Sequence, residues 1–161
     1  MGKKSKQILG EIDDGVVIDH IPIKAVWEVA KILRVDKEDP GKIHLGDGYD
    51  SIQTIGGRKG MLKIQGRNLD DYEFDLIALV APDATVNIIK NRRVVRKIKV
   101  RIPEKLENLI YCHNSRCITN NEREQKHGLK SVVLYDSNTK QFRCYYCEHS
   151  FYREDVRLKF D

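Results

Sequence analysis

The chain has 161 residues, 33% of them charged, and a formal net charge of +5 at pH 7. This length allows one ordinary domain or two small ones. No apolar run approaches the roughly 20 residues that cross a bilayer, and the first thirty residues lack the apolar core of a secretory signal. We therefore expect a soluble, cytoplasmic protein without a membrane partner. The net charge permits a nucleic-acid partner, but 24 acidic residues along the chain make this weak evidence.

The first hundred residues combine two hydrophobic periodicities. Apolar residues spaced three to four apart predict two helices, and β-branched residues alternating with polar ones predict strands. The predicted elements are, in chain order, a strand over 15–21, a helix that begins at Pro22, a strand over 43–45, a further short strand around 52–55, a strand over 61–65, a helix between 68 and 80, and strands over 85–89 and 94–102. This order matches an α+β, ferredoxin-like arrangement, an antiparallel sheet with two helices and one extra strand.

We place the domain boundary after Ile102, which gives domains of residues 1–102 and 103–161. The second domain is expected to be small and all-β, with strands over 108–111, 131–135 and 141–144 and a turn over 136–139. It holds too few large apolar residues for a self-sufficient core. A bound metal would supply the missing free energy of folding.

Polar groups along the predicted sheet suggest a small anionic ligand. In the strand over 61–65, alternation places Lys63 on the face opposite Leu62 and Ile64. Residues 90–101 contain seven basic residues and no acidic one. That density suits phosphate binding, although a solvated edge strand protected by charge explains it equally well.

Two further groups belong to the same hypothesis. His20 follows Asp19 at the end of the first strand, and Lys97 lies within the basic run. A carboxylate can accept hydrogen bonds from ribose hydroxyls, while Lys63, Lys97 and His20 can face phosphates. A turn histidine bonded to the next helix is the ordinary alternative for His20, and the sequence leaves open whether these groups converge.

Four cysteines, all after residue 110, form the strongest pattern in the sequence. Their spacing is C-x4-C, a gap of 26 residues, and C-x2-C, at Cys112, Cys117, Cys144 and Cys147. Two close pairs on tight loops suit one tetrahedral Zn²⁺, so we expect one structural zinc per chain. Disulfides are the alternative, which a reducing compartment disfavours.

The same pattern argues against catalysis. His113 and His149 adjoin the cysteines and could replace a sulfur ligand, but four thiolates already saturate a structural site. The sequence shows no nucleophile elbow, no P-loop and no paired histidines at helical spacing. We therefore expect no catalytic residues.

The chain resembles the regulatory chain of aspartate carbamoyltransferase from about residue 7 to its end. The segments that carry the resemblance are 17–22 (VIDHIP), 57–59 (GRK) followed by 62–64 (LKI), 81–82 (AP) followed by 84–87 (ATVN), and the cysteine pattern with residues 114–115 (NS), 117–118 (CI) and 146–148 (YCE). The resemblance implies a non-catalytic subunit of pyrimidine biosynthesis. Its first domain would bind nucleoside triphosphates, with CTP typically inhibiting and ATP activating, and would pair with a second regulatory chain. Its zinc domain would dock onto the catalytic chain.

The resemblance also implies a set of nucleotide-binding residues. Asp19 and Lys63 would lie near the ribose or base, and His20 and Lys97 near the phosphates. The remaining members of the set are Leu9 and Ile12 from the N-terminal segment, Asn87 and Ile89 from a strand that walls the pocket, and Arg92 from the turn that follows, where the best-known members of the family have an aromatic residue.

A zinc-ribbon protein that binds nucleic acid is the main alternative. It would use the basic run 90–101 and the aromatic residues Tyr145, Tyr146, Phe151 and Tyr152 for backbone contact and base stacking. These aromatic residues also suit the core of a small zinc domain, and the interspersed acids leave no continuous basic face. We therefore expect no nucleic-acid partner.

Overall fold

A computed structural model describes residues 10–38, 41–52 and 56–159 of the chain. The chain folds as two compact units, Met1–Arg101 and Ile102–Asp161. In the part of the chain that is described, no helix has both the length and the apolar character needed to cross a membrane.

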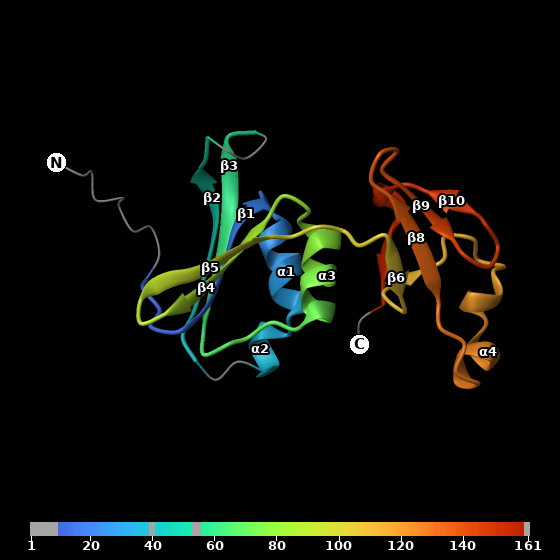
Figure 1. Cartoon of the computed structure of the whole chain (residues 1–161), viewed down its shortest axis with the longest axis horizontal. Helices are drawn as coiled ribbons and strands as arrows, with labels where there is room; N and C mark the ends of the chain where they lie inside the picture. The colour runs from blue at the N-terminus through green and yellow to red at the C-terminus, as the bar shows by residue number, and fades with distance from the viewer. Residues whose placement is uncertain (1–9, 39–40, 53–55, 160–161) are drawn as a thin grey trace. The chain divides into compact units, whose positions relative to one another are not determined.

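The first unit is built on a five-stranded antiparallel sheet with the strand order β2-β3-β1-β4-β5. Its strands are β1 (Gly15–Pro22), β2 (Ile43–Asp50), β3 (Arg58–Gln65), β4 (Thr85–Lys90) and β5 (Arg93–Lys99). The helices α1 (Ala25–Ile32) and α3 (Asp71–Val80) lie on one face of this sheet, and α2 (Val35–Glu38) is a single short turn (Figure 1). The predicted α+β, ferredoxin-like fold is confirmed, with β5 as the extra strand.

The first helix begins later than predicted. Pro22 still belongs to β1, where it lies opposite Lys59, and α1 starts at Ala25. The delay accompanies a tertiary contact, because Lys24 adopts a left-handed backbone with φ 69° and its N–H donates to Asp47 Oδ2 in β2 at 2.9 Å.

Two strand predictions also differ from the structure. The strand β2 continues to Asp50, beyond the predicted residues 43–45, because a register shift between Gly46 and Tyr49 lets pairing with β3 resume. The further strand around 52–55 falls mostly on residues 53–55, which lie outside the described part of the chain.

Alternation along the strands separates a buried face of the sheet from a polar one. The buried face packs against α1 and α3, and its members are fully inaccessible: Val16, Ile18, Leu62, Ile64 and Val86 from the strands, with Val26, Val29 and Ile77 from the helices. Burying each such aliphatic side chain contributes about 1.5–3 kcal/mol. This core holds the sheet in one register, so the side chains between these positions point to the other face.

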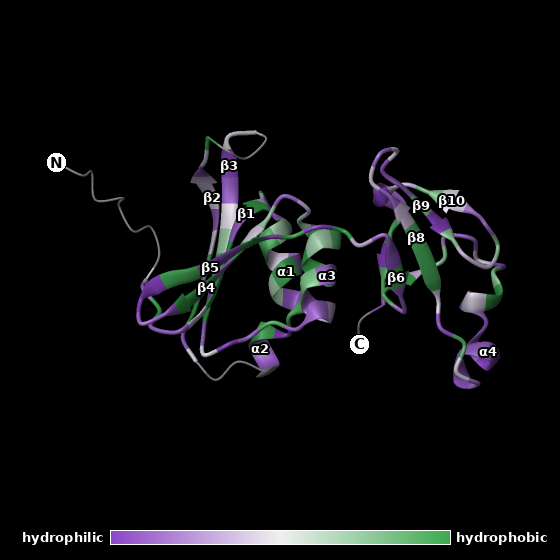
Figure 2. Ribbon diagram, viewed as in Figure 1, coloured by the Kyte–Doolittle hydropathy of each residue, from purple (hydrophilic) through white to green (hydrophobic). Residues whose placement is uncertain are grey.

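The second unit contains a four-stranded sheet, ordered β10-β9-β8-β6, and a two-stranded sheet, β11-β7. Its strands are β6 (Lys105–Glu107), β7 (Ile110–Tyr111), β8 (Val132–Asp136), β9 (Gln141–Cys144), β10 (Ser150–Phe151) and β11 (Arg157–Leu158). The hydrophobic strand β8 lies against a small core in which Leu106, Ile110, Val133 and Phe142 are fully buried (Figure 2).

Two details of the second unit escaped the sequence patterns. The predicted strand over 108–111 is shortened to β7, because Asn108 has a left-handed backbone with φ 56°, and the strand β6 that precedes Asn108 was not predicted. A short helix, α4 (Glu122–Lys126), follows the 3-10 turn η1 (Ile118–Asn120), and a second such turn is η2 (Arg153–Asp155). The helix α4 has no apolar residue, so hydrophobic periodicity could not predict it.

A capping box fixes the start of α3. The side chain of Asp70 accepts a hydrogen bond from the backbone N–H of Glu73 at 2.8 Å, and Glu73 Oε2 accepts one from the N–H of Asp70 at 3.0 Å. These two bonds satisfy donors that a helix otherwise leaves unpaired at its first turn.

We predict that Asp70→Ala destabilises the first unit by about 0.5–2 kcal/mol, because it removes this cap. Urea unfolding followed by the fluorescence of Trp27, the only tryptophan, measures the change. Asp70→Asn keeps an acceptor at the same position and should retain most of the stability. Equal losses in both variants would contradict a capping role.

Candidate functional site

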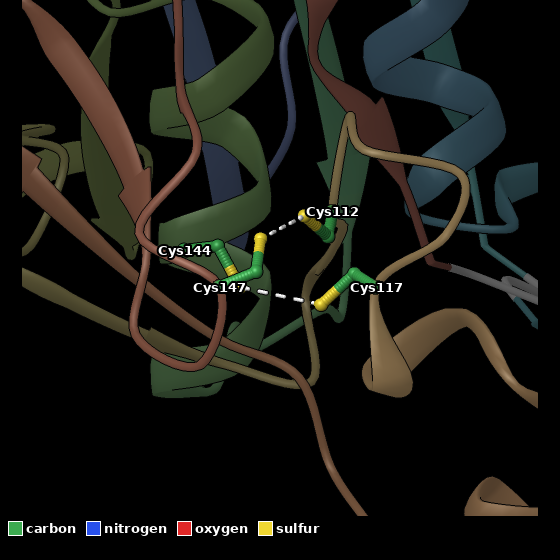
Figure 3. A group of neighbouring side chains, drawn as sticks. All are labelled: Cys112, Cys117, Cys144 and Cys147. Carbon is green, nitrogen blue, oxygen red and sulfur yellow. Dashed lines mark hydrogen bonds between the residues drawn. The ribbon is translucent and has the colours of Figure 1, made fainter.

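The four cysteines of the second unit form one compact cluster (Figure 3). Their Sγ atoms all lie within 4.8 Å of one another, with 3.6 Å between Cys112 and Cys147 and 3.7 Å between Cys117 and Cys144. Four sulfurs at about 2.3 Å from a tetrahedral Zn²⁺ are separated by about 3.8 Å. A disulfide needs about 2.05 Å, and all four are free thiols. The geometry is therefore that of a metal site.

Backbone and side-chain hydrogen bonds shape the loop that carries the first cysteine pair. The N–H of Cys117 donates to the carbonyl of Asn114 at 3.0 Å. The side-chain amide of Asn120 donates to the carbonyls of both Cys112 and Asn114, at 2.8 Å each. Asn120 thus ties the end of η1 to the residue that follows β7.

The second cysteine pair lies on a tight turn between β9 and β10. The N–H of Cys144 donates to the carbonyl of His149, and the N–H of Glu148 donates to the carbonyl of Cys144, both at 3.0 Å. Glu148 closes the turn with a left-handed φ of 59°. Neither His113 nor His149 is part of the cluster, and their rings stack on each other at 5.7 Å.

The electrostatics of the thiols favour a bound cation. Burial raises the pKa of Cys112 and of Cys144, so these thiols resist ionisation on their own. Partial burial also opposes ionisation of Cys147, but the N–H of His149 and the neighbouring thiols outweigh it and lower its pKa to about 7. A metal ion supplies the positive charge that stabilises buried thiolates.

The first unit contains a cavity of about 390 Å³ on the face of the sheet that α1 and α3 do not cover. Small-molecule pockets commonly measure about 300–1,000 Å³. Its lining comes from strands β1, β3, β4 and β5, from the turn between β4 and β5, and from the segment before β1: Glu11, Ile12, Val17, Asp19, Met61, Lys63, Asn87, Ile89, Arg92 and Val94.

Strand register explains why these residues meet. Val17 on the central strand lies opposite Lys63 on one side and opposite Asn87 on the other. Asn87 in turn lies opposite Lys97, and Lys63 lies opposite His44. Directly opposed residues share a face of the sheet, so one row of side chains crosses all five strands.

The structure brings together six of the nine residues predicted to bind a nucleotide: Ile12, Asp19, Lys63, Asn87, Ile89 and Arg92 all line the cavity. Lys97 does not line it but is the neighbour of Asn87 across the ladder. His20 does not line it either and follows Asp19 along β1. Leu9 lies outside the described residues.

Asp19 is held in place by a partly buried ion pair. Lys59 Nζ lies 2.8 Å from Asp19 Oδ1, and both side chains are less than a fifth exposed. The N–H of His20 donates to the same carboxylate at 2.7 Å. The His20 imidazole keeps Nδ1 buried without a hydrogen-bond partner among the described residues.

Asn87 presents a free acceptor in the cavity wall. Its side-chain NH₂ donates to the carbonyl of Val17 at 3.4 Å, which leaves Oδ1 buried with no partner in the described part of the chain. A buried acceptor of this kind is suited to a donor group on a ligand. Lys63 Nζ meanwhile donates to the carbonyl of Gly10 at 3.1 Å.

Sequence reasoning missed part of the site. Val17, Met61 and Val94 line the cavity, and Lys59 supports it from beside Asp19. Strand alternation could have identified two of them. Val17 lies two positions from Asp19, and Met61 lies two positions from Lys63, so each shares a face of its strand with a predicted residue. Glu11 had no such signal, since it lies in no strand.

Comparison with known proteins matches both units. Residues 8–101 match the family described as aspartate carbamoyltransferase regulatory chain, allosteric domain, and residues 104–157 match the metal binding domain of the same chain. An allosteric domain followed by a metal-binding domain defines the class of non-catalytic regulatory subunits. The individual relatives identify one particular regulatory subunit within this class. The chain belongs to the family of aspartate carbamoyltransferase regulatory chains, as its resemblance predicted.

Three relatives illustrate the match, and each is an aspartate carbamoyltransferase regulatory chain. The protein of Pyrococcus horikoshii is 39% identical over 90% of this chain and 92% of its own length. That of Caldivirga maquilingensis is 38% identical over 94% and 90%, respectively. That of Parabacteroides distasonis is 34% identical over 98% and 97%.

We predict that Asn120→Ala weakens metal binding by about 10- to 100-fold, because it frees the carbonyls that shape the first cysteine loop. Competition with a chromophoric chelator measures the affinity. Asn138→Ala, in the turn between β8 and β9, is the matched control and should leave the affinity unchanged. Unaltered affinity in the Asn120 variant would show that the loop is fixed without it.

Proposed function

We propose that this chain is the subunit through which nucleoside triphosphates control aspartate carbamoyltransferase in the cytoplasm. Its domain of residues 1–102 binds CTP and ATP, and its domain of residues 103–161 docks onto the catalytic chain through a fold stabilised by one Zn²⁺. The observation that carries the proposal is the cavity that assembles Asp19, Lys63, Asn87 and Arg92 in a domain of an allosteric family.

The cavity offers separate surfaces for the parts of a nucleotide. Its apolar members, Ile12, Val17, Ile89 and Val94, suit the base. Asp19 and the free Oδ1 of Asn87 can accept hydrogen bonds from ribose hydroxyls or from a base amine.

Two lysines on this face of the sheet are our candidates for contacts with the phosphates. Lys63 lines the cavity, and Lys97 lies beside Asn87 on the same face of the sheet. Lys59 is engaged with Asp19, so we assign Lys63 and Lys97 to the phosphates. We also assign His20 to the phosphates, as the resemblance to the family implies. Triphosphates carry enough negative charge to draw Lys63 away from the neutral carbonyl of Gly10.

We predict that Lys97→Ala weakens triphosphate binding roughly tenfold or more, since a charge-assisted hydrogen bond contributes about 1.5–3 kcal/mol. Calorimetric titration of the full chain with CTP and with ATP measures the affinity. Arg96→Ala is the matched control, because Arg96 lies opposite Ile88 and points to the other face. Equal affinity in the Lys97 variant would remove Lys97 from the site, and displacement of the nucleotide by DNA would favour the nucleic-acid alternative.

Zinc is the metal that the cysteine cluster fits best. Four thiolates in tetrahedral arrangement are typical of structural Zn²⁺ sites, and no coordination position remains for a reacting water. The second unit has a small core, so we assign the ion a structural role. An ion that binds only the folded form stabilises that form.

The surface around the cysteine loops suits a protein partner. The large apolar residues Ile118, Tyr145 and Tyr146 are 52%, 63% and 42% exposed, and the polar residues Ser115, Arg116 and Glu148 lie among them. Apolar and aromatic side chains with a polar rim are characteristic of protein interfaces. Loops fixed by a metal also lose less conformational entropy on docking. We assign this surface to the catalytic chain and the first domain to pairing with a second regulatory chain.

We expect the purified chain to contain one zinc, and we expect removal of zinc to release the catalytic chain, because the docking loops lose their shape. Metal analysis and sedimentation of the reconstituted complex before and after chelation measure both effects. Nucleotide binding by the first domain should persist in the released chain, which is the internal control. A complex that survives verified loss of zinc would refute the docking role.

A further inference from the structure

Residues 10–14, here called the strap, make one wall of the cavity in the first unit. They precede β1 and belong to no helix or strand. Glu11 and Ile12 of the strap line the cavity, and Ile12 is only 4% exposed. The strap runs from Gly10, beside Lys63, to the turn between β4 and β5, where Arg92 lies. The position of the strap therefore decides the shape of the cavity.

The first anchor of the strap depends on a residue that the ligand also needs. Lys63 Nζ donates to the carbonyl of Gly10 at 3.1 Å. Gly10 lies against His44, since a Cβ at this position would come within 2.4 Å of the imidazole. When Lys63 turns to a phosphate, the Gly10 carbonyl loses its donor. The other end of the strap must then keep the wall in place.

That other end is held by a group of contacts to the turn between β4 and β5. Arg92 Nε lies 2.6 Å from Asp13 Oδ1, and Arg92 Nη1 lies 4.0 Å from Glu11 Oε2. The backbone N–H of Arg92 donates to the carbonyl of Asp13 at 2.8 Å, and that of Asn91 donates to Asp14 Oδ1 at 2.8 Å. Arg92 thus contacts the strap through both its backbone and its side chain.

The backbone of Arg92 supports the same interpretation. Asn91 and Arg92 both have left-handed φ angles, 49° and 63°, as a two-residue turn between antiparallel strands requires. Glycine is favoured at the second of these positions, and a long side chain is uncommon there. An unfavourable backbone of this kind persists where surrounding contacts fix it, and here those contacts come from the strap.

We propose that Arg92 is a positioning residue for effector binding: through Asp13 and Glu11 it fixes the strap as a wall of the cavity, instead of recognising the base itself. The inference rests on the proposed function of the cavity. The guanidinium of Arg92 already faces two carboxylates, which compensate its positive charge and weaken its attraction for a phosphate. In a chain with an aromatic residue at this position, no such ion pair could form.

The ion pair between Arg92 and Asp13, here called the latch, is charged throughout the neutral range. The hydrogen bond from Arg92, together with its charge, holds the pKa of Asp13 below its usual range. A carboxyl group with a lowered pKa loses its partner only when the pH falls through that lowered value, well below neutrality. Both side chains are more than half exposed, so added salt screens the pair at constant pH. Salt is therefore the variable that tests the latch.

The decisive variant is Asp13→Ala, because Asp13 does not line the cavity. The latch predicts that this change weakens CTP and ATP binding by about two- to fivefold, the range of a solvent-exposed ion pair. Arg92→Ala should cost the same, and the double variant should cost no more than either. If Arg92 instead contacts the nucleotide, Asp13→Ala frees its charge, and binding stays equal or becomes tighter.

Calorimetric titration of the full, zinc-loaded chain with CTP and with ATP provides the measurement, with thermal unfolding to verify the fold of each variant. Asp83→Ala, an exposed carboxylate in the turn before β4, is the matched control. Exchanging the charges, with Asp13→Arg and Arg92→Asp together, should restore part of the affinity, and about 0.5 M salt should remove the difference between the native chain and Asp13→Ala.

Two failures are distinguishable. If the native chain binds neither triphosphate, the proposed function itself is wrong. If the native chain binds and Asp13→Ala binds equally well or better, or if the two single variants add fully, only the latch is overturned. A loss that persists unchanged in high salt also overturns it, since a purely structural effect of the substitution would not respond to screening.

Discussion

The alternation of side chains along the central strand β1 constrains everything else in the first unit. Val16 and Ile18 are wholly buried against the helices, so Val17 and Asp19 must point to the opposite face, where they line the cavity. Because β1 pairs with both β3 and β4, the same parity is imposed on Lys63 and Asn87. A slip by one residue would bury the polar set and expose the aliphatic one, at a cost far above the stability of a small domain. The hydrophobic core thus positions the side chains that line the cavity.

Within that site, charge is largely neutralised before any ligand arrives. Lys59 faces Asp19, and Arg92 faces Asp13 and Glu11. Pairing compensates the charge of these carboxylates, and among the described residues the hydrogen bond that Lys63 donates goes to the neutral carbonyl of Gly10. The N-terminal strap is anchored to both Lys63 and Arg92.

The second unit follows a different constraint. Its core contains few fully buried large side chains, and burial raises the pKa of two of its four thiols, Cys112 and Cys144. A cluster of this kind is unfavourable as isolated thiolates and favourable around a cation, so metal binding and folding are coupled. The loops that carry the cysteines also carry exposed Ile118, Tyr145 and Tyr146. One ion can therefore fix both the fold and the surface offered to a partner.

The sequence by itself determined the features that depend on local patterns. Period-two alternation placed Lys63 on the other face of its strand from Leu62 and Ile64. The capping residues placed the start of α3 near Asp70, and the spacing of the cysteines placed all four in one cluster. These features follow from residues a few positions apart. Only the tertiary structure decided which distant groups meet: that Lys59 is paired with Asp19, that Arg92 faces the strap, and that Lys97 lies opposite Asn87 across the ladder between β4 and β5. Such pairings depend on strand order and on left-handed residues such as Lys24 and Asn108, which no periodicity reveals. The physical reason is that long-range partners are selected by the packing of the whole sheet, which no short segment specifies.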